Sequence, residues 1–147
     1  MPGPFTVDAS VFLNAFNEGE AGHAHSREFL DDIQAHSIPL ILPTLILPEV
    51  AAAISRGTRK PELGLEFANS LSRLANTVFI PVDLSLARHA AQIAAQQGLR
   101  GSDSVYIAVA NRFATALVTN DRQQRERCVG IVIAISPLDA LNNLKSR

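Results

Sequence analysis

The sequence predicts an α/β fold in which one five-stranded parallel sheet lies between two layers of helices. Short apolar runs alternate along the chain with longer segments whose apolar residues recur at helical spacing. The apolar runs are continuous, which is typical of strands buried on both faces of a parallel sheet. Helices between such strands supply the crossovers, so we expect an α/β/α sandwich.

The expected strands are short and bounded by polar residues or turns. They cover residues 5–8, 38–42, 78–82, 116–119 and 131–135. The helices expected between and after them cover residues 10–16, 26–35, 49–55, 61–75, 85–97, 102–113 and 137–144, with a short one suggested over 122–127. A polar stretch over 18–25 separates the first two helices. The helix over 49–55 stops at Gly57 and the one over 85–97 ends at Gly98, a residue that commonly terminates helices.

Composition favours a single globular domain over residues 1–147, because no repeat, low-complexity tract or linker divides the chain. Apolar residues make up 47%, charged residues 18%, and the net charge is −1, so bulk charge gives no reason to expect a nucleic acid. Cys128 is the single cysteine, which excludes a disulfide framework and a thiolate metal cluster. We see no signal peptide, and the longest apolar run, over 38–50, contains three prolines and is too short to cross a membrane. These features predict a soluble, cytoplasmic protein.

Four carboxylates stand at the margins of apolar segments: Asp8, Glu49, Asp103 and Asp121. Asp8 and Asp121 follow predicted strands, whereas Glu49 and Asp103 open predicted helices. Ligands of open parallel sheets bind beyond the carboxyl ends of the strands, where the strand order reverses, so all four acids can reach one rim of the sheet. We expect no basic side chain among them.

Acids in such places are costly to desolvate and usually need a cation or a hydrogen-bond partner. A hard divalent ion such as Mg²⁺ or Mn²⁺ accepts oxygen ligands, activates a bound water and offsets charge on a phosphoryl oxygen. Hydrolysis of phosphodiester bonds is the reaction that fits this pattern best. The sequence has neither a Gly-x-Ser-x-Gly nucleophile elbow nor a Gly-rich phosphate loop.

Four segments carry a resemblance to a known family: TVDASV at 6–11, LPEV at 47–50, GSDSVYIA at 101–108 and LVTND at 117–121. In this order they resemble the PIN-domain family, and within it most closely the toxin ribonucleases of the VapC type. The match covers essentially the whole chain, and the first and third segments are its most specific parts. Pro48, immediately before Glu49, departs from the pattern and leaves the start of that helix open.

The resemblance implies a metal-dependent endoribonuclease that acts as the toxin of a type II toxin–antitoxin pair. Its acidic quartet would be Asp8, Glu49, Asp103 and Asp121; of these, Asp8, Asp103 and Asp121 would hold Mg²⁺ or Mn²⁺, with Ser10 and Thr119 supporting the acids by hydrogen bonds. The resemblance also implies an RNA substrate cleaved to a 5′-phosphate and a 3′-hydroxyl, a homodimer and a cognate antitoxin.

Other interpretations remain open. The chain could be a PIN-like nuclease that is not a toxin, or a catalytically silent domain that binds RNA or a partner with the help of a metal. A phosphoacceptor receiver or an aspartate-based phosphatase is more remote, because Ser10 stands where the phosphatase pattern needs an acid.

Roles outside the acidic quartet are less distinct. Arg122 and Arg125 could hold substrate phosphates, although a solvated helix face is the alternative. His23 and His25 are expected on the surface, and Tyr106 and Phe113 in the core rather than as base-stacking platforms.

Overall fold

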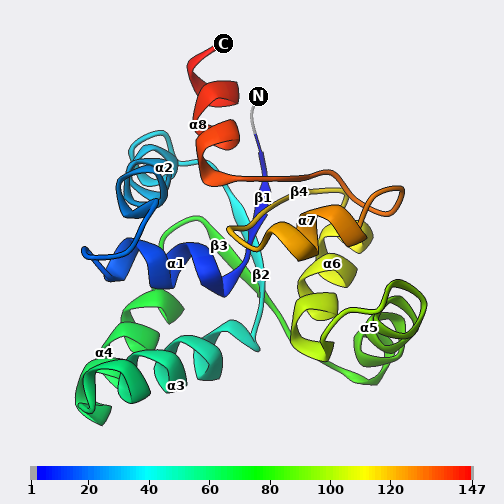
Figure 1. Ribbon diagram of the computed structural model, residues 1–147, viewed down its shortest axis with the longest axis horizontal. Helices are drawn as coiled ribbons and strands as arrows, with labels where there is room; N and C mark the ends of the chain where they lie inside the picture. The colour runs from blue at the N-terminus through cyan, green and yellow to red at the C-terminus, as the bar shows by residue number, and fades with distance from the viewer. Residues whose placement is uncertain (1–2, 147) are drawn as a thin grey trace.

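The computed structural model describes residues 3–146 (Figure 1). The strands are β1 (Phe5–Val7), β2 (Leu40–Pro43), β3 (Thr77–Ile80), β4 (Ala116–Val118) and β5 (Ala134–Ile135). The helices are α1 (Ala9–Phe16), α2 (His23–Ala35), α3 (Ile46–Thr58), α4 (Pro61–Ser72), α5 (Leu84–Gln97), α6 (Gly101–Phe113), α7 (Arg122–Arg127) and α8 (Pro137–Lys145).

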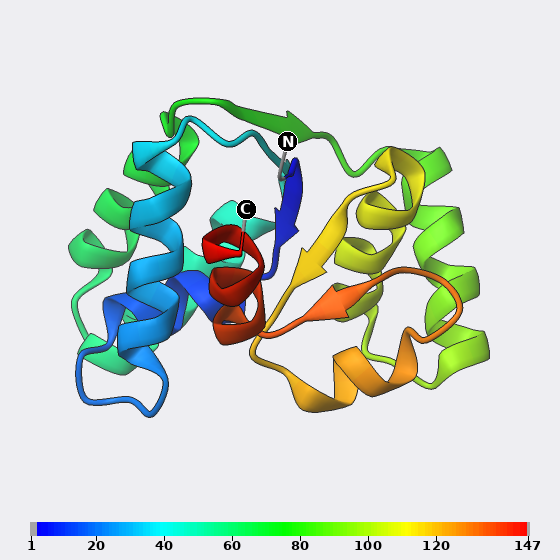
Figure 2. The same cartoon turned by 90° about the horizontal axis from the view of Figure 1, so that it is seen from above.

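The five strands form one sheet in the order β3-β2-β1-β4-β5, and every pair is parallel. The chain builds outward from β1 to β2 and β3, and then returns to add β4 and β5 on the other side of β1. Helices α1–α4 lie on one side of the sheet and α5–α7 on the other (Figures 1 and 2). The predicted α/β/α sandwich with a five-stranded parallel sheet is therefore confirmed, and the strand order reverses between β1 and β4.

The core lies on both faces of the three inner strands. Their apolar side chains are fully buried because helices cover both faces: Val7, Leu40, Leu42, Leu117 and Val118. The edge strand β5 is shorter than the predicted strand over 131–135. Ile133, within the predicted range but before β5, is 73% exposed, so this apolar residue did not indicate a buried strand position.

Helix α2 begins at His23, three residues earlier than predicted, so part of the polar stretch over 18–25 is helical. His23 Nδ1 lies 2.9 Å from the carbonyl oxygen of Asn14, and this contact joins the first turn of α2 to α1. The side chain of Asn14 is buried and donates to Glu20 and to the Ala21 carbonyl, which closes the turn between α1 and α2. The polar side chains of this stretch form hydrogen bonds within the protein, and composition alone could not distinguish them from side chains that contact only water.

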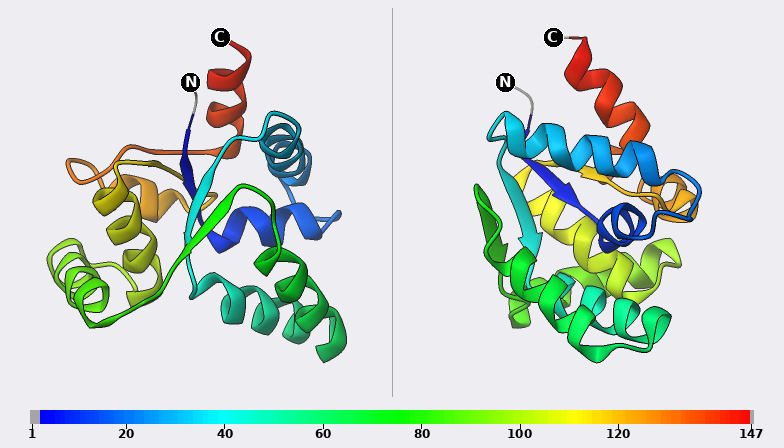
Figure 3. Two further views of the ribbon diagram at one scale, coloured as in Figure 1. Left: turned by 180° about the vertical axis from the view of Figure 1, so that it is seen from behind. Right: turned by 90° about the vertical axis from the view of Figure 1, so that its left-hand side faces the viewer.

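Helix α8 packs against α2 (Figure 3).

Helix α3 begins at Ile46 rather than at Glu49, and it continues through Gly57 to Thr58. Pro48 is tolerated because it stands in the first turn, where backbone N–H groups have no partner within the helix. Helix α4 then packs closely on α3. A Cβ atom at Gly64 would lie 2.3 Å from the carbonyl oxygen of Ala51, so only glycine permits this approach.

No helix within residues 3–146 has the length and apolar character that crossing a membrane requires.

Candidate active site

Asp8 lies at the carboxyl end of β1, where it both extends the sheet and begins α1. Its backbone N–H donates to the Val118 carbonyl at 2.9 Å, which joins the end of β1 to β4 at the strand-order reversal. Its carboxylate Oδ2 accepts the backbone N–H of Ser10 at 2.9 Å and so caps α1. The side chain is buried, and the hydrogen bond from Ser10 supplies a partner for one of its two carboxylate oxygens. The end of β1 therefore places a carboxylate beneath the rim of the sheet.

Asp121 takes the equivalent place after β4 and caps α7 through its Oδ1, which accepts the backbone N–H of Gln124 at 3.2 Å. Thr119 is fully buried; its Oγ1 accepts the Asp121 N–H at 3.1 Å and lies 3.3 Å from the Ser10 hydroxyl. The backbone N–H of Asn120 also donates to the Ser10 hydroxyl, at 3.1 Å. The two predicted supporting hydroxyls, Ser10 and Thr119, thus bridge the ends of β1 and β4.

Gln124 is a buried site residue that sequence reasoning missed. Its Oε1 accepts the Thr119 hydroxyl at 2.7 Å, and its Nε2 donates to the Asp103 carbonyl at 3.1 Å. One side chain therefore connects α7, the end of β4 and the first turn of α6. The available signal was weak, because a helix of six residues is too short for a periodicity that separates its buried face from its exposed one.

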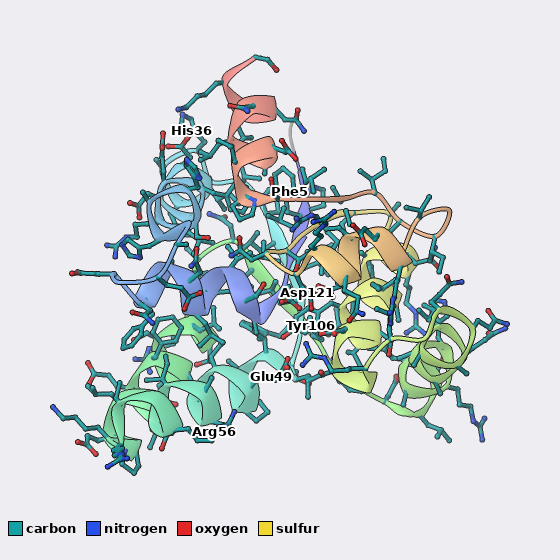
Figure 4. All side chains as sticks on the ribbon, viewed as in Figure 1. Phe5, His36, Glu49, Arg56, Tyr106 and Asp121 are labelled. Carbon is teal, nitrogen blue, oxygen red and sulfur yellow. The ribbon has the colours of Figure 1, made fainter. Side chains whose placement is uncertain are left out.

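Glu49 faces α6 from the first turn of α3. Tyr106 lies one helical turn after Asp103, and its hydroxyl donates to Glu49 Oε1 at 2.5 Å. In Figure 4, Glu49, Tyr106 and Asp121 lie near the centre of the view, where α1, α3 and α6 approach one another. The ring of Tyr106 is buried, as expected, but its hydroxyl also orients an acid of the site. Phe113, expected in the core, is instead 38% exposed because it ends α6 at the surface.

Asp103 sits in the first turn of α6 and is paired with a basic residue of its own chain. Arg100, the residue before α6, donates from Nε to Asp103 Oδ2 at 3.0 Å and from Nη2 to Asp121 Oδ2 at 3.5 Å. The expectation that no basic side chain stands among the acids is wrong. Arg100 and Asp103 face the same rim because they are three residues apart across a helix start.

The acids influence one another electrostatically. Burial raises the pKa of Asp8, and the nearby charge of Asp103 raises it further. Burial also raises the pKa of Glu49, against the opposing hydrogen bond from Tyr106 and with additional repulsion from Asp8 and Asp103. Burial and mutual repulsion therefore both disfavour the charged forms of Asp8 and Glu49, which a nearby cation would favour.

The side chains at the rim offer carboxylate and hydroxyl oxygens, which are the ligand atoms that a hard divalent ion prefers. The side chains do not converge as a ready-made cage: within residues 3–146, no group of three His, Cys, Asp or Glu side chains is placed to hold a metal ion. Arg100 instead contacts Asp103 and Asp121. A metal would therefore need the carboxylates to turn toward one another.

The arginines considered from sequence have other contacts in the structure. Arg122 is on the exposed face of α7 and pairs with Glu126 at 2.8 Å. Arg125 donates from Nη1 to the Thr119 carbonyl at 2.8 Å, so it holds the loop that carries Asp121. Among the arginines within residues 3–146, Arg100 is the one that forms ion pairs with acids of the site.

A pocket of about 350 Å³ lies apart from the acids, between α1, α2 and α4. Its lining is mainly apolar and includes Phe12, Phe16, Leu30, Phe67 and Leu74. None of the four acids lines it, so its role is separate from the chemistry of the rim.

The PIN domain family model matches residues 5–129, which includes all four acids and all but the last strand. The chain belongs to the PIN domain family. Membership of this family supports assignment as a nuclease, and PIN domain nucleases are generally dependent on a divalent metal. No protein of curated function matches the chain by sequence.

Solved structures share the PIN fold at low sequence identity. VapC20 of Mycobacterium tuberculosis, described as a sarcin-ricin loop cleaving toxin, has a TM-score of 0.71 and 17% identity over 88% of this chain and 97% of that chain. VapBC of Salmonella typhimurium, solved bound to DNA, has a TM-score of 0.67 and 18% identity over 93% and 99%. FitAcB of Neisseria gonorrhoeae has a TM-score of 0.69 and 19% identity over 91% and 98%. At these identities the likeness establishes the fold.

Proposed function

We propose that this PIN domain protein is a metal-dependent endoribonuclease that hydrolyses RNA phosphodiester bonds. The observation that carries the proposal is the gathering of Asp8, Glu49, Asp103 and Asp121 at the strand-order reversal, with raised pKa values for Asp8 and Glu49. Carboxylates that are partly buried and repel one another are suited to binding a divalent cation. The choice of RNA follows the activity described for VapC20, together with the motif resemblance.

In this proposal Asp8, Asp103 and Asp121 hold Mg²⁺ or Mn²⁺. When bound, the ion supplies a water of lowered pKa and a positive charge beside the phosphoryl oxygens. The N-caps of α1 and α7 each use one carboxylate oxygen, Oδ2 of Asp8 and Oδ1 of Asp121, at the ends of adjacent strands, so the second oxygen of each acid lies outside the cap. Gln124 holds the first turn of α6, and with it Asp103, against the same edge.

Glu49 is proposed as the residue that orients the attacking water and takes its proton. Tyr106 occupies Oε1, which leaves Oε2 as the accepting atom. A carboxylate whose pKa is raised by burial is a stronger base than an ordinary surface glutamate. The water oxygen then bonds to phosphorus, the bond from phosphorus to the 3′ oxygen breaks, and a proton passes to that oxygen. The products are a 5′-phosphate and a 3′-hydroxyl.

We expect Tyr106→Phe to lower cleavage by about tenfold and to move the acidic limb of the pH–rate profile to higher pH. The hydrogen bond from Tyr106 favours the charged form of Glu49, so its loss raises the pKa of Glu49 further and the base becomes active only at higher pH. The rate constant kcat/KM measured against pH checks this. Phe113→Leu, at the exposed end of the same helix, is the control; an unchanged limb in Tyr106→Phe contradicts the role given to Glu49.

The test of the proposed function is cleavage of labelled structured RNA with Mg²⁺, with Mn²⁺ and with EDTA, beside single-stranded DNA of the same sequence. We expect fragments bearing 5′-phosphates only with RNA and only when metal is present. Asp8→Asn, purified identically, is the inactive control. Metal binding without cleavage of any RNA would favour the alternative of a catalytically silent RNA- or partner-binding domain.

We also propose that the protein acts in the cytoplasm as a homodimeric toxin held by an antitoxin. The proposal draws on VapBC of Salmonella typhimurium, whose structure is that of a toxin–antitoxin complex bound to DNA, and on the apolar pocket between α1, α2 and α4. An apolar pocket with charged residues at its margin suits an amphipathic segment of a partner protein.

Co-expression with the product of the neighbouring open reading frame tests this partner. We expect the two proteins to purify together and Leu30→Glu, inside the pocket, to reduce recovery at least about tenfold, because a carboxylate would replace an apolar side chain that the partner's apolar face would contact. Leu65→Glu is the matched control, since Leu65 is 60% exposed on α4 and does not line the pocket. Equal recovery of both variants would assign the contact to another surface.

A further inference from the structure

Arg100 makes an unusual pair of contacts for a residue at a nuclease rim. Its guanidinium reaches across the start of α6 to Asp103 and on to Asp121, at the start of α7. The two acids are only 12% and 26% exposed, whereas the Arg100 side chain is 75% exposed. A solvent-exposed cation therefore contacts two acids that are mostly buried.

This arrangement adds little to the fold. Exposed ion pairs contribute little to stability, and α6 and α7 are already joined by the buried Gln124. The contact has an electrostatic effect instead. The guanidinium of Arg100 lies beside the acids of the rim, and its charge offsets part of their repulsion.

We propose that Arg100 is an internal counter-ion that competes with the divalent metal ion for Asp103 and Asp121. The inference rests on the proposed function, in which these two acids are metal ligands. Arg100 contacts both carboxylate oxygens of Asp103, Oδ2 at 3.0 Å and Oδ1 at 3.5 Å, and Oδ2 of Asp121 at 3.5 Å. A single ion that used Asp103 and Asp121 would therefore have to displace the guanidinium from both acids. Displacement is feasible because the Arg100 side chain is 75% exposed, so its guanidinium can exchange these contacts for water.

Competition makes a prediction about metal affinity in the absence of RNA. Arg100→Gln is expected to bind Mn²⁺ about fivefold more tightly than the wild-type protein, because the ion no longer has to displace an exposed guanidinium from Asp103 and Asp121. Arg100→Lys is expected to lie between them, because an ammonium keeps the charge but cannot contact both acids with a planar fork. Titration calorimetry with Mn²⁺ alone measures this affinity.

Arg122→Gln is the matched control, since Arg122 is an arginine at the start of α7 whose partner is Glu126 rather than an acid of the site. We expect its Mn²⁺ affinity to be that of the wild type. A second readout is the melting temperature with EDTA and with Mn²⁺. Mn²⁺ should raise the melting temperature of Arg100→Gln by more than that of the wild type, because the variant without metal has lost its counter-ion.

The outcomes separate the inference from the proposed function. Equal or weaker Mn²⁺ binding by Arg100→Gln, with normal binding by the wild type, overturns the competition and leaves the nuclease proposal standing. Absence of Mn²⁺ binding by both the wild type and Arg100→Gln overturns both. Tighter binding by Arg100→Gln and an unchanged Arg122→Gln supports the competition even if the RNA that is cleaved has not been found.

Discussion

Asp8→Asn is expected to abolish RNA cleavage and, at the same time, to stabilise the protein without metal. Loss of a group that only supports a metal ligand typically costs about 10–100-fold, so loss of a proposed ligand should cost at least about 100-fold. Asparagine keeps the cap on α1, because its side-chain oxygen accepts the Ser10 N–H as aspartate does. The change therefore removes charge and leaves the local geometry in place.

The stability gain follows from the direction of the pKa shift. Because burial raises the pKa of Asp8 in the folded state, ionisation of Asp8 opposes folding. The two proteins should be equally stable below the ordinary pKa of 3.8, and the advantage of Asp8→Asn should grow as the pH rises through the folded-state pKa. At neutral pH a gain of about 1 kcal/mol would raise Tm by about 2–4 °C.

Thermal melts in EDTA at several pH values, beside RNA cleavage assays, measure both effects. Mg²⁺ should narrow the difference in Tm, because the ion stabilises only the wild-type protein. A variant that is less stable at neutral pH would show that Asp8 is stabilised by partners other than a metal. Residual cleavage above about 1% would remove Asp8 from the ligand set.

Gln124→Leu is expected to lower both stability and metal affinity, although Gln124 is not among the proposed ligands. The variant leaves the Thr119 hydroxyl without its acceptor in a fully buried position, which costs about 1–3 kcal/mol. It also releases the first turn of α6, and with it Asp103, from α7. Loss of this support should weaken Mn²⁺ binding and cleavage by about 10–100-fold.

The chain offers a matched control at the preceding position. Gln123 is an exposed glutamine on the same helix, so Gln123→Leu should change stability by less than about 0.5 kcal/mol and leave Mn²⁺ affinity unaltered. Chemical denaturation and Mn²⁺ titration compare the two variants. If Gln124→Leu loses stability but binds Mn²⁺ normally, Gln124 acts in folding alone.

Much of the fold could be predicted from local patterns. Continuous apolar runs mark strands buried on both faces, and the alternation with helices requires parallel crossovers. That is why Asp8 and Asp121 could be placed at one rim before the strand order was known. The boundaries were less accurate where a polar stretch formed internal hydrogen bonds, as at His23, or where a helix began without a side-chain cap, as at Ile46.

The sequence by itself determined the α/β/α class, the places of the four acids on the ends of their elements, and the motif order that points to the PIN domain family. Each element and motif depends on residues that are near neighbours in the chain, and their order can be read along the sequence without knowledge of contacts. Only the tertiary structure decided the strand order, the burial of Gln124 and the pairing of Arg100 with two acids. These depend on which faces of α6 and α7 meet at the end of β4, and packing between elements sets that contact.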